Sequence, residues 1–252
     1  MFSKFKHRSD KLERLDIGDY TADEYESCIG ELQLVNNWMG DRWSLEKTFL
    51  QDVEASDLKH FSVLDVGAGS GELLHVVAEW SKRNSKSSWA VGLELNERSA
   101  KAISERTNEQ IYALRGNALC LPFADNSFDY VISSLFTHHL KNNEIVQTLQ
   151  ELSRVARRRI FVIDLHRHPI SYLLYTTVAK IVLHTRLVRE DGALSILRGF
   201  QPHELMELAS AAGLSNVSVQ RHFPFRLVLS ASKAAVSTTS HDSSAISFDS
   251  AA

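Results

Sequence analysis

The stretch "VLDVGAGSGELL", residues 63–74, limits what this chain can fold into more than any other part of it. An apolar run ends at Val66, and glycines then occupy positions 67, 69 and 71. Three glycines at alternate positions weaken a helix or a strand, so they favour a turn whose backbone approaches another group closely. A turn of this kind after a first strand is typical of folds that bind a nucleotide at the end of a parallel sheet.

The residues after the glycines narrow the choice of nucleotide. A dinucleotide loop requires Gly or Ala three positions after its second glycine, where this chain has Glu72. A carboxylate at the start of the next helix repels a pyrophosphate, which binds at the positive helix N-terminus. S-adenosylmethionine carries a sulfonium and an ammonium group but no phosphate, so it fits better. Asp65 can receive the ammonium group, and Glu94, which closes the next predicted strand, can accept hydrogen bonds from both ribose hydroxyls.

Short apolar runs alternate with helical periods over residues 60–165, which predicts an α/β fold with a parallel sheet covered on both faces. The predicted strands are 61–66, 89–95, 111–116, 128–135 and 158–165, and a helix is predicted over 72–80. Residues 201–214 read as a helix closed by Gly213. Residues 216–222 and 225–232 alternate in polarity like an antiparallel strand pair.

The flanking segments divide the chain into three parts: a helical cap over 1–58, the main domain over 59–230 and a disordered tail over 231–252. In the cap, Thr21 and Glu24 fit a capping box for a helix that runs to Met39, and a shorter helix is predicted from Ser44. The tail is mostly Ser, Ala and Thr and buries too little apolar surface to offset its ordering entropy.

Residues 168–200 are predicted to form an insertion that covers the bound substrate as an apolar lid. Its first half is an amphipathic helix with an apolar stripe that includes Ile170, Leu174 and Ile181, and the alternative is that this stripe packs on the sheet. A basic loop is predicted next, and its three arginines either hold an acidic substrate or are solvated. They are Arg186, Arg189 and Arg198.

Several motifs together carry a family resemblance. "VLDVGAGSGELL", "VGLELN", "GNALCLPFADNSFDYVISS" and the following "THHL" resemble the successive motifs of class I S-adenosylmethionine-dependent methyltransferases, in the branch of ubiquinone and menaquinone biosynthesis methyltransferases. The resemblance implies a Rossmann-like seven-stranded sheet in the order 3-2-1-4-5-7-6, with strand 7 antiparallel. It also implies a cofactor site made by Asp65, Gly67, Ala68, Gly69, Gly71, Glu94, Leu95, Asn117, Ala118 and Ser134. Many relatives have Asp at the position of Asn117. The Asn117 side chain still has an oxygen that can accept a hydrogen bond, so the cofactor site is expected to be kept.

Histidines are the candidate catalytic residues, because attack by a phenol of pKa about 10 gains from a general base at neutral pH. His138 and His139 follow the fourth predicted strand, and His166 follows the fifth. Both places lie at the carboxyl ends of strands, where ligands of such sheets bind. His139 and His166 are preferred, because "HHL" and "DLHR" recur in the resembling sequences.

Other segments resemble a smaller group that methylates phenolic or quinone-type polyketide and lipid products. They are "ERLDIGDYTADEYESCIGELQLVNNWMGDRWSL", "FVIDLHRH" and "LVREDGALSILRGF". The resemblance favours O-methylation of a small hydrophobic acceptor, with C-methylation of a quinone or polyketide precursor as the alternative. A protein or RNA methyltransferase and an inactive cofactor-binding scaffold are less favoured, because no proline motif follows strand four and the loop glycines and Glu94 are intact.

Composition limits the partners. The net charge of −3, from 28 basic and 31 acidic residues, predicts no nucleic-acid partner. The two cysteines have no metal-ligand spacing, so no metal is predicted and a reducing cytoplasm is expected. The longest apolar stretch is too short and polar to span a bilayer, so no stable membrane insertion is predicted. The oligomeric state stays open.

Overall fold

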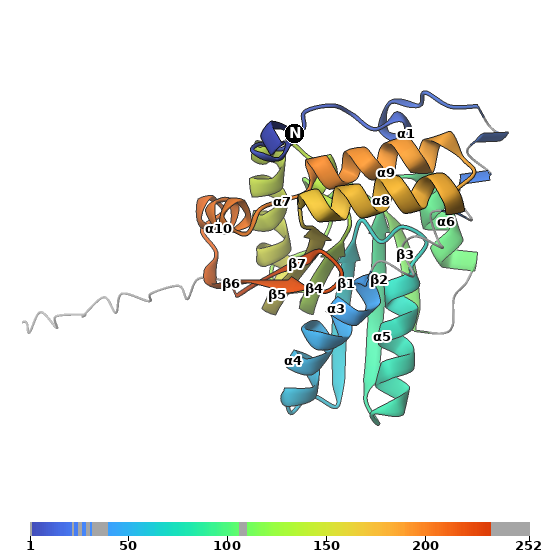
Figure 1. Cartoon of the computed structure of the whole chain (residues 1–252). Coiled ribbons are helices and arrows are strands. Elements are labelled where there is room, and N and C mark those ends of the chain that lie inside the picture. The colour runs from blue at the N-terminus through green and yellow to red at the C-terminus, as the bar shows by residue number, and fades with distance from the viewer. Residues whose placement is uncertain are drawn as a thin grey trace, which may run out of the picture.

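The computed structural model describes residues 2–21, 23–24, 27–28, 31, 40–105 and 110–232. Its centre is a seven-stranded sheet in the order β3-β2-β1-β4-β5-β7-β6 (Figure 1). The first five strands pair in parallel, and β7 runs antiparallel to both β5 and β6. This is the order and direction that the family resemblance predicts. The strands are β1 (His60–Val66), β2 (Ser87–Glu94), β3 (Ile111–Arg115), β4 (Phe128–Ser134), β5 (Ala156–Leu165), β6 (Ser215–His222) and β7 (Arg226–Ser232).

Helices cover both faces of the sheet, which explains why the central strands are apolar almost without alternation. On one face, residues of α3, α4, α5 and α6 pack with the sheet around Phe49, Leu74 and Ile103. On the other face, α7 and α10 pack around Leu149, Leu152 and Leu205. These helices are α3 (Asp41–Lys47), α4 (Phe49–Ala55), α5 (Glu72–Arg83), α6 (Glu97–Glu105), α7 (Asn142–Val155) and α10 (Pro202–Ala211).

Two further helices, α8 (Pro169–Val182) and α9 (Arg186–Arg198), lie side by side across one end of the sheet (Figure 1). The prediction of a basic loop at Arg186, Arg189 and Arg198 is wrong, because all three lie in α9. Charged residues in this segment interrupt the apolar spacing of three and four residues that would indicate a helix. Asp191 and Arg198 lie on the buried side of α9, where hydrogen bonds to neighbouring segments replace apolar contacts.

The N-terminal segment is mostly extended in the described residues and contains a short 3-10 helix (Phe2–Phe5) and α1 (Arg14–Ile17). Buried Arg167 ties it down by donating from Nε to the Phe5 carbonyl oxygen, 3.0 Å away. The capping-box hydrogen bonds between Thr21 and Glu24 are present, at 2.9 and 3.2 Å. The predicted course of that helix to Met39 lies largely outside the described residues. After it, α3 and α4 replace the single short helix predicted from Ser44.

The last strand ends at Ser232, as its alternating pattern predicts, so the boundary between the main domain and the tail lies after residue 232 and not after residue 230. Ala231 and Ser232 belong to β7, where Ala231 is fully buried and pairs with Ile160. The assignment of these two residues to a disordered tail is therefore wrong, since their alternation with Ser230 continues the strand pattern. The prediction for residues 233–252 lies outside the described residues. Within the described part of the chain, no helix is long and apolar enough to cross a membrane.

Candidate active site

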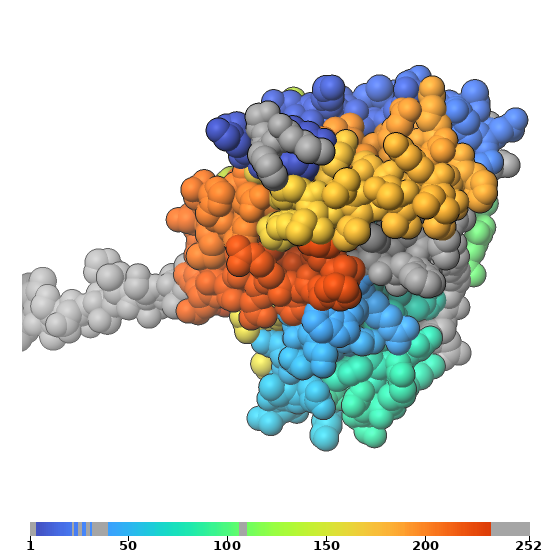
Figure 2. All heavy atoms as spheres, in the orientation of Figure 1, coloured from blue at the N-terminus to red at the C-terminus, as the bar shows by residue number. Residues whose placement is uncertain are grey.

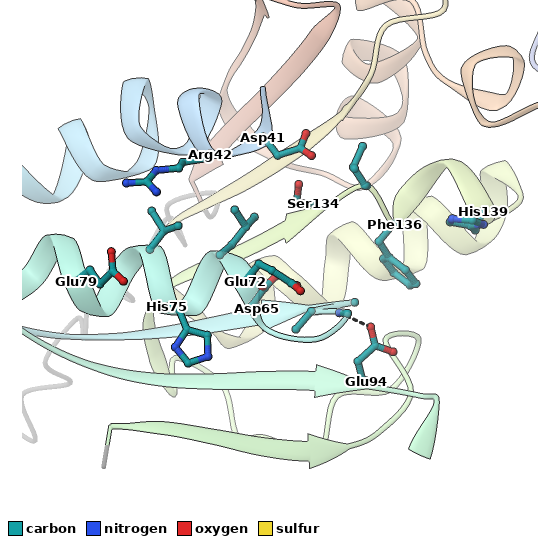
Figure 3. A pocket seen from close by; sticks show the side chains of 16 residues that line it. Asp41, Arg42, Asp65, Glu72, His75, Glu79, Glu94, Ser134, Phe136 and His139 are labelled. Carbon is teal, nitrogen blue, oxygen red and sulfur yellow. Dashed lines mark hydrogen bonds between the residues drawn. The ribbon is translucent and has the colours of Figure 1, made fainter. Parts of the chain in front are cut away.

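A cavity of about 710 Å³ opens at the carboxyl ends of β1, β2 and β4 (Figure 3). Seven of the predicted site residues line it: Asp65, Gly67, Ala68, Gly69, Glu94, Ser134 and His139. Side chains of α3 and α5, among them Asp41, Arg42 and Glu72, form other parts of its wall. Ligands of open α/β sheets bind at this end, and three strands that are separate in sequence contribute to it.

The glycine loop forms a turn with a left-handed backbone, a conformation that glycine permits. Gly67 and Gly69 have φ values of +73° and +57°, a region that most L-residues avoid. A Cβ atom on Gly67 would lie 2.5 Å from Cγ of Phe136, so no side chain fits between the loop and that ring. At Gly69 nothing lies within 4 Å of such an atom. The loop is thus closed against Phe136 at its first glycine and open at its second.

Asp65 is a buried carboxyl group at the base of the glycine loop. Its side chain is 2% exposed, and its Oδ1 has no hydrogen-bond partner among the described residues. Burial, followed by the negative charges of Glu94 and Glu72, raises the pKa of Asp65 to about 8. A buried carboxyl group without a partner is costly, and a bound cation would remove that cost.

Glu94 and Glu72 place two more carboxylates at the same loop. The Gly69 amide donates to Glu94 Oε1 at 2.6 Å, which is the hydrogen bond drawn in Figure 3. Burial raises the pKa of Glu94, against the hydrogen bonds from the backbone of Gly69 and its own neighbours. The Ser70 hydroxyl donates to Glu72 Oε1 at 2.5 Å. Three acids around one loop favour a cationic ligand and disfavour a pyrophosphate.

His139 stands at the edge of this cavity and is held by acids from the N-terminal segment. Its Nδ1 lies 3.1 Å from Asp16 Oδ1 and 3.8 Å from Glu13 Oε2, and its side chain is 29% exposed. Burial lowers its pKa, but the hydrogen bond to Asp16 and the charges of Glu13, Asp16 and Asp164 outweigh burial, so the pKa of His139 is raised. With Nδ1 bonded to Asp16, Nε2 is the nitrogen left to exchange a proton.

His138 lies behind His139 and is buried. Its Nδ1 donates to Asp164 Oδ1 at 2.7 Å, and the same carboxylate accepts from the Thr137 hydroxyl at 2.6 Å. Despite complete burial, the contacts with His138 and Thr137 hold the pKa of Asp164 far below its usual range. Ligand atoms of Glu13, His138 and His139 lie within 4.8 Å of one another, close enough to hold a cation. Nδ1 of each histidine also lies beside an aspartate, Asp164 for His138 and Asp16 for His139.

The other predicted site residues lie outside the lining of this cavity. Gly71 is the N-cap of α5, where a Cβ atom would lie 3.3 Å from the Ile103 side chain, and Leu95 is exposed beside a separate surface hollow. The Asn117 side chain accepts from the Leu119 amide at 2.9 Å, and Ala118 is buried in the core. His166 is buried beside His168, and burial lowers its pKa.

Three residues that the sequence analysis did not single out support the histidine pair: Glu13, Asp16 and Asp164. Arg198, which the sequence analysis placed in a basic loop, supports it as well. Arg198 donates from Nε to the His138 carbonyl at 3.0 Å and from Nη2 to the His139 carbonyl at 2.6 Å. The sequence does contain an indication for Asp164, because this residue lies near the carboxyl end of a predicted strand, where such sheets bind ligands. Glu13 and Asp16 are more than 120 residues from the histidines in sequence, and no sequence pattern indicates their contact with them.

Comparisons with known proteins agree on one class. A family model described as "Methyltransferase domain" matches residues 63–159. The chain is 31% identical over 169 residues to the demethylmenaquinone methyltransferase of Roseiflexus sp. (strain RS-1), covering 62% of this chain and 68% of that protein. It is 31% identical over 121 residues to the protein of that name from Shouchella clausii (strain KSM-K16), covering 46% of this chain and 47% of that one. The chain thus spans about half the length of several curated relatives that it matches.

A solved structure matches the fold. Magnesium protoporphyrin IX methyltransferase from Synechocystis PCC 6803, solved with bound SAH, superposes with a TM-score of 0.54 at 15% sequence identity. The match covers 77% of this chain and 84% of that one. At this level of sequence identity the match shows a shared fold.

Proposed function

Since the chain belongs to the class I S-adenosylmethionine-dependent methyltransferases, we propose that it methylates a small hydrophobic acceptor, phenolic or quinone-type, and that O-methylation is its main reaction. The observation that carries this proposal is the position of His139. This histidine, held by Asp16, lines the same cavity as the glycine loop, Asp65 and Glu94. A candidate general base and the residues proposed to bind the cofactor thus line the same cavity.

The residues of the cavity suit the cofactor of this family. Asp65 has a buried, unpartnered oxygen for its ammonium group, and the open side of Gly69 leaves room for close approach to the backbone. Glu94 would hold the ribose, and the Ser134 hydroxyl, which also lacks a partner among the described residues, would lie near the sulfonium. When bound, S-adenosylmethionine supplies a methyl group on a positively charged sulfur.

His139 would take the proton of the acceptor hydroxyl at Nε2 while that oxygen becomes a nucleophile. Asp16 and Glu13 stabilise the imidazolium that this transfer creates, which raises the basicity of the ring. Arg198 holds the carbonyls of His138 and His139 and so fixes the backbone that carries the base. An acceptor that attacks through carbon loses the proton of that carbon after methylation, so the same histidine could accept it in the C-methylation alternative.

The two demethylmenaquinone methyltransferases support a quinone-type acceptor by their names, and Glu72 and Glu94 at the glycine loop disfavour an anionic acceptor beside it. His166 remains a second candidate base from the sequence. His139 is preferred over it, because His139 lines the described cavity and His166 does not.

The test is an acceptor panel of alkylphenols, naphthols and hydroquinones with methyl-labelled S-adenosylmethionine, analysed by mass spectrometry and NMR to distinguish O-methyl from C-methyl products. His139→Gln is expected to lower kcat about 100-fold or more for phenols, the usual range for a general base, while cofactor affinity stays unchanged. His60→Gln, at the exposed opposite end of β1, is the matched control and should retain full activity.

The same assay separates the remaining function classes. Label transfer to protein or RNA and to none of the small acceptors would replace the proposal with a macromolecular methyltransferase. Cofactor binding with no transfer to any acceptor would indicate a binding scaffold. A His139→Gln variant as active as the parent chain would refute the assigned role of this histidine.

A further inference from the structure

Helix α8 turns a stripe of large apolar side chains to solvent. Six of them are about half exposed or more, with Ile181 the most exposed at 80%: Ile170, Leu173, Leu174, Val178, Ile181 and Val182. Their spacing of three and four residues places them along one face of the helix. In Figure 2 the gold surface of α8 lies on the outside of the molecule, beside the turn between β6 and β7.

Neither function predicted for this stripe accounts for it. The alternative that the stripe packs on the sheet is wrong, because the opposite side of α8, around Ala179 and Tyr175, makes the inward contacts with α9. The stripe also contributes no residue to the lining of the cavity at the glycine loop. Single exposed apolar side chains are common, but a continuous row of six marks a surface that contacts another apolar phase or partner.

The charges near the stripe indicate which partner it fits. Lys180 is the only charged residue of α8, and Arg186 follows the helix. Both are exposed, and neither forms an ion pair within the described part of the chain.

The acids of this region are already engaged inside the protein. Glu31 accepts from the Thr185 amide and hydroxyl, Asp191 accepts from the Arg14 and Leu15 amides, and Glu190 pairs with Arg14. The stripe therefore has unpaired positive charge at its end and no unpaired acid among these neighbours, which complements an anionic surface.

We propose that α8 docks on an anionic lipid bilayer, lying in the plane of the interface with its apolar stripe among the upper acyl chains and Lys180 and Arg186 at the lipid phosphates. A helix of 14 residues is about 21 Å long, shorter than the roughly 30 Å of a bilayer core, so it suits an interfacial position. Interfacial helices combine a large apolar face with basic residues in this way. If the proposed function holds, docking would also bring the cavity to an acceptor dissolved in the membrane.

Vesicle co-sedimentation of the full chain tests the proposal, with sucrose-loaded vesicles of phosphatidylcholine alone or mixed with phosphatidylglycerol. We expect binding to the anionic vesicles, weaker binding to the neutral ones, and weaker binding at high salt. The double variant Leu174→Asp/Ile181→Asp should lower the partition coefficient at least tenfold. Met206→Asp, a partly exposed apolar residue of α10, is the matched control and should bind like the parent chain.

A second variant, Lys180→Glu/Arg186→Glu, keeps the stripe and reverses the charge, and it should lose the preference for anionic vesicles. Equal binding by the parent and the double aspartate variant would overturn the proposal, as would no binding by the parent. A parent dimer that the aspartates dissociate, without vesicle binding, would assign the stripe to a second copy of the chain. The measurement needs neither cofactor nor acceptor, so its result is independent of methyl transfer.

Discussion

Cofactor binding should release a proton from Asp65. In the free protein this carboxyl group has a pKa of about 8, because it is buried and lies near Glu94 and Glu72. A cationic ligand requires the ionised form. At pH 7, one unit below this pKa, about 90% of the chains carry the proton, so binding should release about 0.9 proton per cofactor.

The same linkage makes affinity depend on pH, with a sign that follows from the raised pKa. Below pH 8 each unit costs about 1.36 kcal/mol to ionise Asp65, so binding weakens as pH falls. From pH 7 to pH 6 the Kd should rise close to tenfold. The cofactor amino group, like other α-amino groups of pKa about 7.7 or above, stays charged over this interval and contributes little.

Isothermal titration calorimetry in buffers of different ionisation enthalpy measures the released protons directly. Asp65→Asn is the control: it should release no proton and show a flat pH dependence with weaker affinity at pH 7. In Glu94→Gln one of the neighbouring charges is gone, so the pKa of Asp65 falls and fewer protons should be released. Affinity that stays constant from pH 6 to pH 7, with no proton release by the parent chain, would refute the assignment of Asp65 as the cation partner.

Three further outcomes are expected. Glu94→Ala should weaken cofactor binding by about 1.5–3 kcal/mol, the range for a hydrogen bond to a charged group; unchanged affinity in calorimetry would mean that the ribose lies elsewhere. Gly67→Ala combines left-handed strain of about 1–2 kcal/mol with a clash against Phe136, so its melting temperature should fall further than that of Gly213→Ala, where φ is +72° but the space is open; equal losses would contradict the close approach. In a pH–rate profile, Asp16→Asn should move the acidic limb of kcat to lower pH, because His139 loses the hydrogen bond and charge that raise its pKa; an unmoved limb would exclude Asp16 as its positioning residue.

The sheet could be read from the sequence because its determinants are local or repeated. Apolar runs such as 61–66 and 128–135 are buried on both faces, and the glycines that follow the first run permit the left-handed turn that the chain makes there. The order of strands came from the family resemblance, since no periodicity specifies which strands are neighbours.

The histidine support and helix α9 could not be read in the same way. Asp16 meets His139 across 123 residues, and Arg198 reaches the His138 carbonyl across 60. Such contacts depend on where the N-terminal segment lies over the sheet, which no local pattern encodes. The charges of α9 indicated a basic loop that is either solvated or holds an acidic substrate. The structure instead buries Arg198 and Asp191 with hydrogen-bond partners, so the polarity of these residues did not indicate their exposure.

The central claim is that the cavity at the glycine loop binds S-adenosylmethionine. Calorimetric titration of the full chain with its demethylated product, S-adenosylhomocysteine, and separately with NAD tests it most directly. We expect one molecule of S-adenosylhomocysteine per chain with low-micromolar or tighter affinity, no measurable NAD binding, and loss of binding in an Asp65→Asn/Glu94→Ala variant that still folds. Binding of NAD without S-adenosylhomocysteine, or equal binding by the variant and the parent, would contradict it.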